Sequence, residues 1–250
     1  MAVKPKVIHR CLPRMSLPAT MGFSMKVPNQ DGGGMAWTVT IAQQKGGAGK
    51  TTLAAHLAVA FAGDGARKVA VVDIDPQGSL SRWYTRRTDG IGGETVPKAA
   101  LTFSQITGWR TQAEVDRLKQ DHDLVLIDSP PHMETEAKIA IRAADLVLVP
   151  VQPSPMDLWA TQPTLDMAAA EKRRAMLVIN RMPPRGRLAD SVRAEIDGMG
   201  VPVAPITIGN RTGLAASLLE GRGITETGPR TSAGKEIADL ANTVLTHLSR

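Results

Sequence analysis

The chain has 250 residues, of which 42% are hydrophobic and 22% charged, enough for one large α/β domain with a substantial core. Its formal net charge of +6 admits a polyanionic partner such as DNA, or an anionic membrane surface, without requiring either. The single cysteine, Cys11, excludes an internal disulfide and a multi-cysteine metal cage, and no run of eighteen apolar residues is present to span a membrane.

Residues 1–36 are predicted to be a disordered basic extension. Four prolines and the triplet Gly32-Gly33-Gly34 interrupt them, and five basic residues against one acidic residue give them a charge of +4. The stretch Met15 to Met25 is too broken by polar residues and Pro18 to be the apolar core of a secretory signal. Two explanations stay open: a start codon misplaced upstream of Met35, or a basic arm that helps to bind DNA or lipid.

From residue 37 to residue 250, short β-branched runs alternate with longer helical stretches, which predicts one domain with a doubly wound, mostly parallel sheet and helices on both faces. The predicted strands are Thr38 to Gln43, Lys68 to Ile74, Leu101 to Phe103, Leu124 to Asp128, Leu146 to Val151, Met176 to Asn180 and Val203 to Ile206. The predicted helices are Lys50 to Ala62, Leu80 to Arg86, Thr111 to Lys119, Glu134 to Arg142, Leu158 to Arg173, Leu188 to Ile196, Leu214 to Leu219 and Ala233 to Leu248.

A glycine-rich segment with two lysines follows the first predicted strand and leads directly into the first helix. Glycines let successive backbone N–H groups turn toward one anion, and the helix start adds unpaired N–H groups and its positive dipole end. Lys50 is expected on the β- and γ-phosphates of ATP or ADP, and the Thr51 hydroxyl on Mg²⁺. The residues expected to contact the nucleotide here are Gly46, Gly47, Ala48, Gly49, Lys50, Thr51 and Thr52.

The first lysine of the segment, Lys45, completes the pattern Lys-Gly-Gly-x-Gly-Lys-Thr. This pattern resembles the deviant Walker A motif of the ParA/MinD family of ATPases. The resemblance implies a P-loop fold and a homodimer that forms in the ATP state. It also implies that Lys45 reaches across the dimer to the partner's phosphates while Lys50 acts within its own subunit.

Two carboxylate motifs follow at the ends of predicted strands. The segment Asp73-Ile74-Asp75-Pro76-Gln77 resembles the family's switch-like Asp-x-Asp-Pro-Gln, which implies that Asp75 positions the attacking water or holds the metal shell. Four apolar residues deliver Asp128 to the carboxyl edge of the sheet, a Walker B arrangement that would hold Mg²⁺ through water beside Thr51.

The adenine end of the nucleotide is assigned by resemblance. Asn180 and Arg181, at the end of a predicted strand, resemble the position where relatives contact adenine, and Pro205 is a candidate for the same pocket. His56 lies on the apolar side of the first predicted helix, so it is expected to be a packed histidine and not a catalytic one.

The resemblance covers nearly all of residues 37–250 and implies sequence-independent DNA binding by the dimer, with hydrolysis stimulated by a ParB-like partner or cargo adaptor. Larger relatives carry a second arginine that contacts DNA, and Gly213 stands at that position here. A basic group near the carboxyl end is expected to replace it, because phosphate contacts need only charge. Its members are Arg211, Arg222, Arg230 and Lys235.

Other classes compete with this interpretation. A MinD-like positioning ATPase would hold a membrane with an amphipathic final helix, but the last predicted helix here has few basic residues and no Trp or Phe, which favours packing in the core. A metabolic enzyme on the same scaffold, such as a synthetase, is the second alternative, and Lys45 argues against it. The expected location is the cytoplasm, on the nucleoid in the ATP state, and the cargo can be a plasmid, a chromosome or a protein cluster.

Overall fold

The structure is a computed structural model that describes residues 36–63, 65, 67–89, 99–131, 134–183, 192 and 194–250. Residues 35–250 form one compact unit. The predicted extension at residues 1–36 lies outside the described residues except for Ala36, and it stays a prediction. Most of the predicted helix at 188–196 also lies outside them, with residue 192 and residues 194–197 helical.

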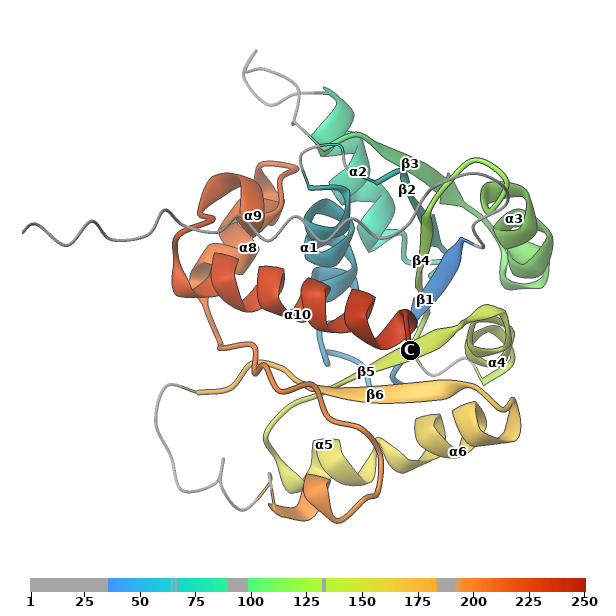
Figure 1. The fold of residues 1–250 in the computed structure, drawn as a ribbon, viewed down its shortest axis with the longest axis vertical. Coiled ribbons are helices and arrows are strands. Elements are labelled where there is room, and N and C mark those ends of the chain that lie inside the picture. The colour runs from blue at the N-terminus through green and yellow to red at the C-terminus, as the bar shows by residue number, and fades with distance from the viewer. Residues whose placement is uncertain are drawn as a thin grey trace, which may run out of the picture. The chain divides into compact units, whose positions relative to one another are not determined.

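A six-stranded, all-parallel sheet forms the centre of the molecule, in the strand order β3-β2-β4-β1-β5-β6 (Figure 1). Its inner strands are hydrophobic and almost wholly buried, as expected of parallel strands that are covered on both faces. The strands are β1 (Trp37–Ile41), β2 (Val69–Asp73), β3 (Leu101–Gln105), β4 (Leu124–Asp128), β5 (Leu146–Val151) and β6 (Arg174–Ile179).

Helices cover both faces of this sheet, which confirms the predicted architecture. One face packs under α1 (Lys50–Ala62), α2 (Ser79–Asp89), α8 (Thr212–Leu219), α9 (Ile224–Thr227) and α10 (Ser232–Leu248). The other packs under α3 (Thr111–Leu118), α4 (Glu134–Ala143), α5 (Pro155–Trp159) and α6 (Gln162–Ala170). Side chains alternate along each strand between these two cores.

The parallel register brings three chain segments to one edge of the sheet. The loop after β1 lies between the ends of β4 and β5, and Ile41 is in register with Asp128. Asp73 at the end of β2 is also in register with Asp128. Because loops at the carboxyl ends of parallel strands form the binding crevice of such sheets, this edge is where a ligand site is expected.

The predicted seventh strand at Val203 to Ile206 was wrong. The segment forms one isolated parallel bridge, Leu177 with Val203, and a second bridge, Met182 with Gly209, lies beyond its end. Pro202 precedes the segment and Pro205 lies within it, and a proline has no N–H to donate to a ladder, which disfavours a continuous strand there.

The single helix predicted over Leu158 to Arg173 was also wrong, because the structure has α5 and α6 in its place. Helix α5 begins early, with Ser154 as its N-cap accepting a hydrogen bond from the Asp157 backbone and Pro155 in its first turn. Pro163 lies in the first turn of α6, where the missing N–H costs nothing, whereas a continuous helix would have placed it in the interior. The four-residue helix α9 was not predicted.

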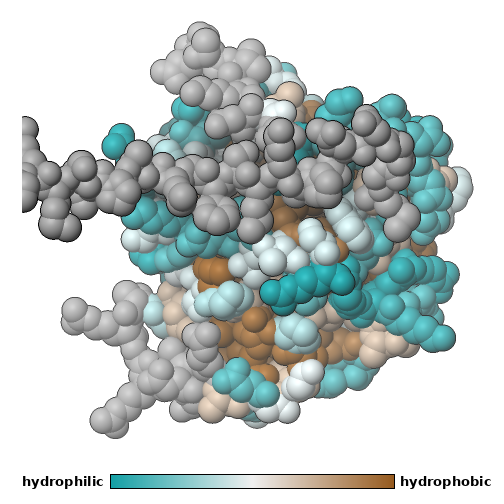
Figure 2. Space-filling model, in the orientation of Figure 1, coloured by the Kyte–Doolittle hydropathy of each residue, from teal (hydrophilic) through white to brown (hydrophobic). Residues whose placement is uncertain are grey.

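The last helix, α10, is a core-packing helix, as its sequence indicated. Ile237, Leu240, Val244 and Leu248 are buried, and hydrophilic or neutral residues line its outer side in the space-filling view (Figure 2). None of the helices in the described part of the chain is both long enough and apolar enough to cross a membrane.

Candidate functional site

Side chains that follow β5 and β6 hydrogen-bond to the backbone of the phosphate loop and fix its shape. Gly47 and Gly49 have φ angles of 79° and 91°, which L side chains rarely adopt. Asn180 Nδ2 donates to the Ala48 carbonyl at 2.8 Å, and Gln152 Nε2 donates to the Gly47 carbonyl at 3.0 Å. Helix α1 then begins without a side-chain cap, so its first N–H groups remain available to an anion.

Lys50 lies inside this loop and is buried. Its ammonium donates to the Gln43 carbonyl at 2.9 Å. Burial lowers the pKa of Lys50, and the carboxylates of Asp128 and Asp75 act in the opposite direction. A phosphate chain here would favour the charged ammonium in the same way as those carboxylates, so the site suits an anionic ligand.

Asp128 is a buried carboxylate that lacks a partner. Neither of its oxygens makes a hydrogen bond of normal geometry to a described residue. Burial raises the pKa of Asp128 to about 7, and the neighbouring carboxylate of Asp73 adds to this, while the Thr51 hydroxyl and Lys50 oppose it. A buried carboxylate without a partner is costly, and a divalent cation beside Thr51 would offset that cost. The residues present therefore fit Mg²⁺.

Asp75 comes from the loop after β2 and lies near both Lys50 and Asp128. Its carboxylate accepts a hydrogen bond from the Gln77 backbone at 2.9 Å, and its own backbone N–H donates to Asp73 at 3.0 Å. Asp73 stands in the same motif, but no role for it was predicted from the sequence. The structure shows that Asp73 is fully buried and orders this loop, and its pKa is raised by that burial.

The Lys45 side chain contacts a residue of its own chain. Its ammonium forms an ion pair with Asp157 Oδ1 at 2.8 Å, and Asp157 is in turn hydrogen-bonded to the Ser154 hydroxyl. The Lys45 side chain is 36% exposed, so it can leave this contact without crossing a packed core. Asp157 belongs to no recognisable motif, so it was not predicted from the sequence.

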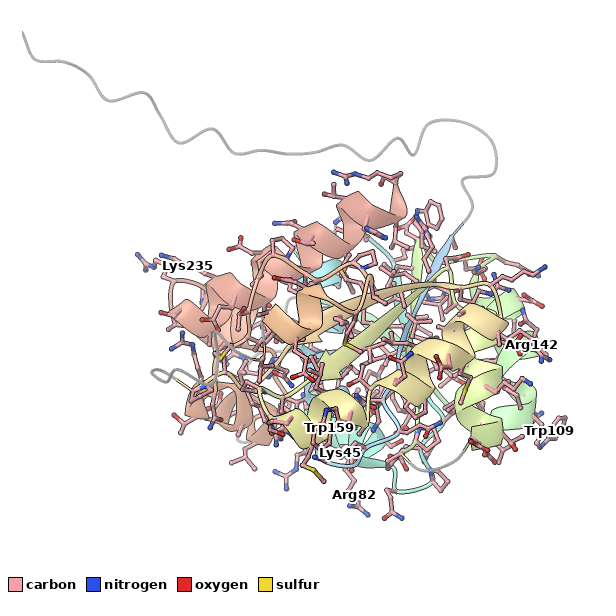
Figure 3. The ribbon with its side chains drawn as sticks, turned by 90° about the horizontal axis from the view of Figure 1, so that it is seen from below. Lys45, Arg82, Trp109, Arg142, Trp159 and Lys235 are labelled. Carbon is pink, nitrogen blue, oxygen red and sulfur yellow. The ribbon has the colours of Figure 1, made fainter. Side chains whose placement is uncertain are left out.

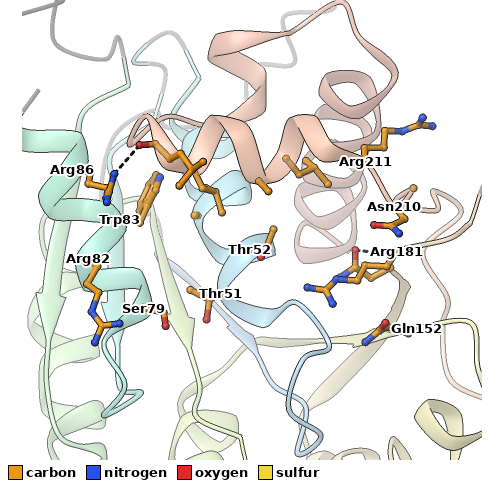
Figure 4. A pocket seen from close by; sticks show the side chains of 17 residues that line it. Thr51, Thr52, Ser79, Arg82, Trp83, Arg86, Gln152, Arg181, Asn210 and Arg211 are labelled. Carbon is orange, nitrogen blue, oxygen red and sulfur yellow. Dashed lines mark hydrogen bonds between the residues drawn. The ribbon is translucent and has the colours of Figure 1, made fainter. Parts of the chain in front are cut away.

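A cavity of about 690 Å³ opens above the start of α1 (Figure 4). Thr51 and Thr52 form its floor, and Asn180 and Arg181 line the side next to β6. Pro205 is exposed and is not among the residues that line this cavity, and its assignment to the adenine pocket stays a prediction. The turn that does line it is Gly209–Asn210, a few residues later, because Pro205 lies along β6 before the chain reaches the cavity.

The four basic residues predicted to contact DNA have different surroundings. Arg211 lies on the cavity rim, and its guanidinium pairs with both oxygens of Glu236. Arg222 is half-buried, and Arg230 and Lys235 are exposed. Within the described part of the chain, none of these last three forms an ion pair.

His56 is a packed histidine, as predicted. It is fully buried, its Nδ1 accepts a hydrogen bond from the Ile224 backbone at 3.0 Å, and its Nε2 lies 3.1 Å from the Leu214 carbonyl, to which it donates. One accepting and one donating nitrogen require the neutral ring. Burial lowers the pKa of His56 to about 4.

The sheet, the glycine loop and the buried aspartate define a P-loop nucleotide-binding protein. Residues 39–224 match the family model of the CobQ/CobB/MinD/ParA nucleotide binding domain, and the chain belongs to this family. It is an ATPase of the ParA/MinD type whose cofactors are ATP or ADP and Mg²⁺.

Individual relatives agree with this assignment. The chain is 31% identical over 220 residues to maintenance of carboxysome distribution protein A of Halothiobacillus neapolitanus, covering 84% of this chain and 97% of that protein. The cell division ATPase MinD of Pyrococcus furiosus shares the fold with a TM-score of 0.70 at 22% identity, covering 85% of this chain and 100% of that one. Cyanothece McdA in complex with ATP shares it with a TM-score of 0.68 at 18% identity, covering 85% and 97%.

Proposed function

We propose that this chain is a positioning ATPase, which dimerises on Mg-ATP, binds DNA without sequence preference, and moves a cargo whose adaptor stimulates hydrolysis. The observation that carries the proposal is the second lysine of the phosphate loop. Lys45 lies at the loop entrance, outside the cluster of Lys50, Asp75 and Asp128, and is held only by a partly exposed ion pair.

The loop residues Gly46 to Thr52 would enclose the phosphates, with Lys50 on the β- and γ-phosphates. Bound Mg-ATP supplies the phosphoanhydride bond that is hydrolysed. Thr51 and Asp128 would hold Mg²⁺, because they offer a hydroxyl and an unpartnered carboxylate at one point. Asp75 would orient the attacking water, since its loop is ordered by Asp73 and its carboxylate keeps room for a second partner. Asn180 and Arg181 would line the nucleoside end, as they line the cavity.

Dimerisation would use Lys45. In the single chain its ammonium is neutralised by Asp157, and a partner's triphosphate is a stronger anion than one carboxylate. Transfer of Lys45 from Asp157 to that triphosphate would make dimer formation depend on the presence of ATP. ADP offers less charge at the same point and would support the dimer less well.

DNA binding would rest on the basic residues near the carboxyl end. Arg222, Arg230 and Lys235 have no acidic partner in the described residues, so their charge is available to phosphates, whereas the charge of Arg211 is shared with Glu236. Each phosphate that is neutralised releases counterions, so the affinity would fall steeply with salt. The protein would then associate with the nucleoid in its ATP state.

The cargo is proposed from the relatives. The Halothiobacillus relative is named for the distribution of carboxysomes, and a Myxococcus xanthus relative is named a chromosome partitioning protein. We propose a cytoplasmic cargo of this kind, a protein assembly or a DNA molecule, with a ParB-like activator or adaptor as the link. A MinD-like membrane role is less well supported, because the apolar side of α10 is occupied by the core.

Four samples test the proposal: wild type, Lys45→Ala, Lys50→Ala and Asp75→Ala. We expect Lys50→Ala to lose nucleotide binding, Lys45→Ala to bind ATP without dimerising, and Asp75→Ala to remain a dimer on random-sequence DNA. Calorimetry, sedimentation and DNA retention measure the three properties. An Asp75→Ala dimer that does not hold DNA but sediments with anionic vesicles would support the membrane role instead.

A further inference from the structure

Helix α2 begins at the nucleotide site and is attached there through one buried carboxylate. Asp73 accepts hydrogen bonds from the backbone and the hydroxyl of Ser81, at 3.0 and 2.8 Å. The same carboxylate accepts the backbone N–H of Asp75 and lies in register beside Asp128. A shift of the Asp75 loop therefore reaches the first turn of α2 directly.

The other half of α2 is clamped to the turn that joins α8 and α9. Arg87 is buried, and its guanidinium donates to both oxygens of Glu226 at 3.0 and 2.8 Å and to the carbonyls of Gly221 and Ala99 at 3.2 and 2.6 Å. Gly221 has a φ of 65°, and a Cβ there would lie 2.5 Å from the Arg87 backbone nitrogen. Opening this contact would strand a buried charge, so α2 and residues 219–226 are joined as one unit.

Two arginines project from the exposed side of this unit. Arg82 and Arg86 are one helical turn apart on α2, are exposed, and line the cavity opposite Arg181 (Figure 4). The guanidinium of Arg86 also donates to the Leu219 carbonyl at 3.2 Å. Trp83, between them, donates through Nε1 to the carbonyl of Arg222 at 3.4 Å, so the Arg222 backbone is bound to the same helix.

The charge of this group is not neutralised. Within the described residues, Arg82, Arg86 and Arg222 form no ion pair, and no aspartate or glutamate lines the cavity. Two other exposed arginines are paired, Arg117 with Glu114 and Arg142 with Glu171, so they serve as a contrast to this group. An unpaired guanidinium at the surface is a bidentate donor suited to a phosphate.

We infer that Arg82, Arg86 and Arg222 form a phosphate-binding ridge for duplex DNA, and that the nucleotide sets its position through Asp73 and α2. This inference rests on the proposed DNA-binding function and extends it to helix α2 itself. In it, Arg87 and Glu226 are positioning residues: they touch neither nucleotide nor DNA and transmit the movement of α2 to the Arg222 turn. The ridge thus gives DNA binding a direct mechanical dependence on the state of the phosphate site.

The ridge is tested by removing two charges at a time. Arg82→Ser with Arg86→Ser is compared with Arg117→Ser with Arg142→Ser, which lowers the net charge equally at two exposed, paired arginines on α3 and α4. Arg142 lies away from both Arg82 and Lys235 in Figure 3. Retention on random-sequence duplex DNA is measured against salt at saturating Mg-ATP. In the first variant the log–log slope should become shallower by roughly 0.9 for each DNA phosphate that is no longer neutralised, and in the second it should stay unchanged.

The coupling between the nucleotide state and DNA binding is tested with Glu226→Gln. This substitution keeps the shape of the side chain and weakens its ion pair with Arg87. ATP affinity by calorimetry and the melting temperature serve as checks on the site and the fold. We expect the ratio of DNA retention with Mg-ATP to retention without nucleotide to fall toward one, while the salt slope keeps its wild-type value. A ratio equal to that of wild type in a folded, ATP-binding protein would overturn the coupling.

The outcomes separate this inference from the function on which it rests. If the wild type in Mg-ATP does not retain DNA at any salt concentration, the proposed DNA binding fails and the ridge fails with it. If the wild type retains DNA and the Arg82/Arg86 variant does so with the same slope, only the ridge is refuted. Wild type and the Arg82/Arg86 variant are also tested for binding to poly-glutamate. If the variant loses poly-glutamate binding and keeps its DNA retention unchanged, these arginines bind an acidic protein segment, and the ridge is also refuted.

Discussion

The buried histidine of α1, His56, makes the free energy of unfolding depend on pH by an amount that can be calculated. His56 holds Leu214, which lines the cavity, and Ile224, which begins α9. The neutral ring is required in the folded protein, where its pKa is about 4, against 6.5 in an unfolded chain. The unfolded state therefore binds more protons between these values, so the contribution of His56 is complete above pH 6.5 and is lost as the pH falls toward 4.

The magnitude follows from the two pKa values. From about pH 7.5 to about pH 5, the linkage relation gives a loss of about 2 kcal/mol in the free energy of unfolding. Asp128 works in the opposite direction, because its folded pKa is raised to about 7 and the nucleotide-free protein gains stability from that group as the pH falls. The wild-type curve alone thus mixes the two effects.

A matched variant isolates the histidine. In His56→Gln the amide can accept from Ile224 and donate to the Leu214 carbonyl, and it does not titrate. Urea unfolding of both proteins across this pH range, without nucleotide, gives a difference in which the Asp128 contribution cancels. We expect wild type to lose about 2 kcal/mol more than His56→Gln. Parallel curves for the two proteins would refute the assignment of a neutral, buried imidazole.

Three further predictions concern the phosphate site. Asp128→Asn should stabilise the nucleotide-free protein at neutral pH by about 4 kcal/mol in thermal or urea unfolding, because a buried carboxylate with a raised pKa is removed. Mg-ATP should raise its melting temperature less than that of wild type, and equal shifts would contradict the metal role. Gly49→Ala should abolish ATP binding in calorimetry, since its φ is 91° and its Cβ would collide with Asn180 Nδ2. Unchanged affinity would show that the loop is adaptable. Asp157→Asn should let the Mg-ATP dimer form at a concentration several-fold lower in sedimentation, because Lys45 is released from a contact worth about 0.2–1 kcal/mol; weaker dimerisation would mean that Asp157 supports the dimer.

Local patterns were enough for most of the sheet and for the phosphate loop. The strands at Leu124–Asp128 and Leu146–Val151 and the helix at Lys50–Ala62 have the bounds that the sequence predicted. Their signals are strong because a strand buried on both faces reads as a continuous apolar run, and because the glycine loop with its closing Lys-Thr is typical of a loop that leads into a helix start. Prediction failed at Val203 to Ile206, where composition favoured a strand, but Pro202 before the segment and Pro205 within it supply no N–H to a ladder.

The sequence by itself determined the class of protein, the loop that meets the phosphates and the aspartates that end their strands, since each depends on neighbours within a few residues. Only the tertiary structure decided which groups those residues meet. Asp73 lies beside Asp128, Lys45 pairs with Asp157, and Arg87 clamps Glu226, each across dozens of intervening residues. Such partners depend on the order of strands in the sheet and on how helices pack over it, and no local periodicity encodes that order.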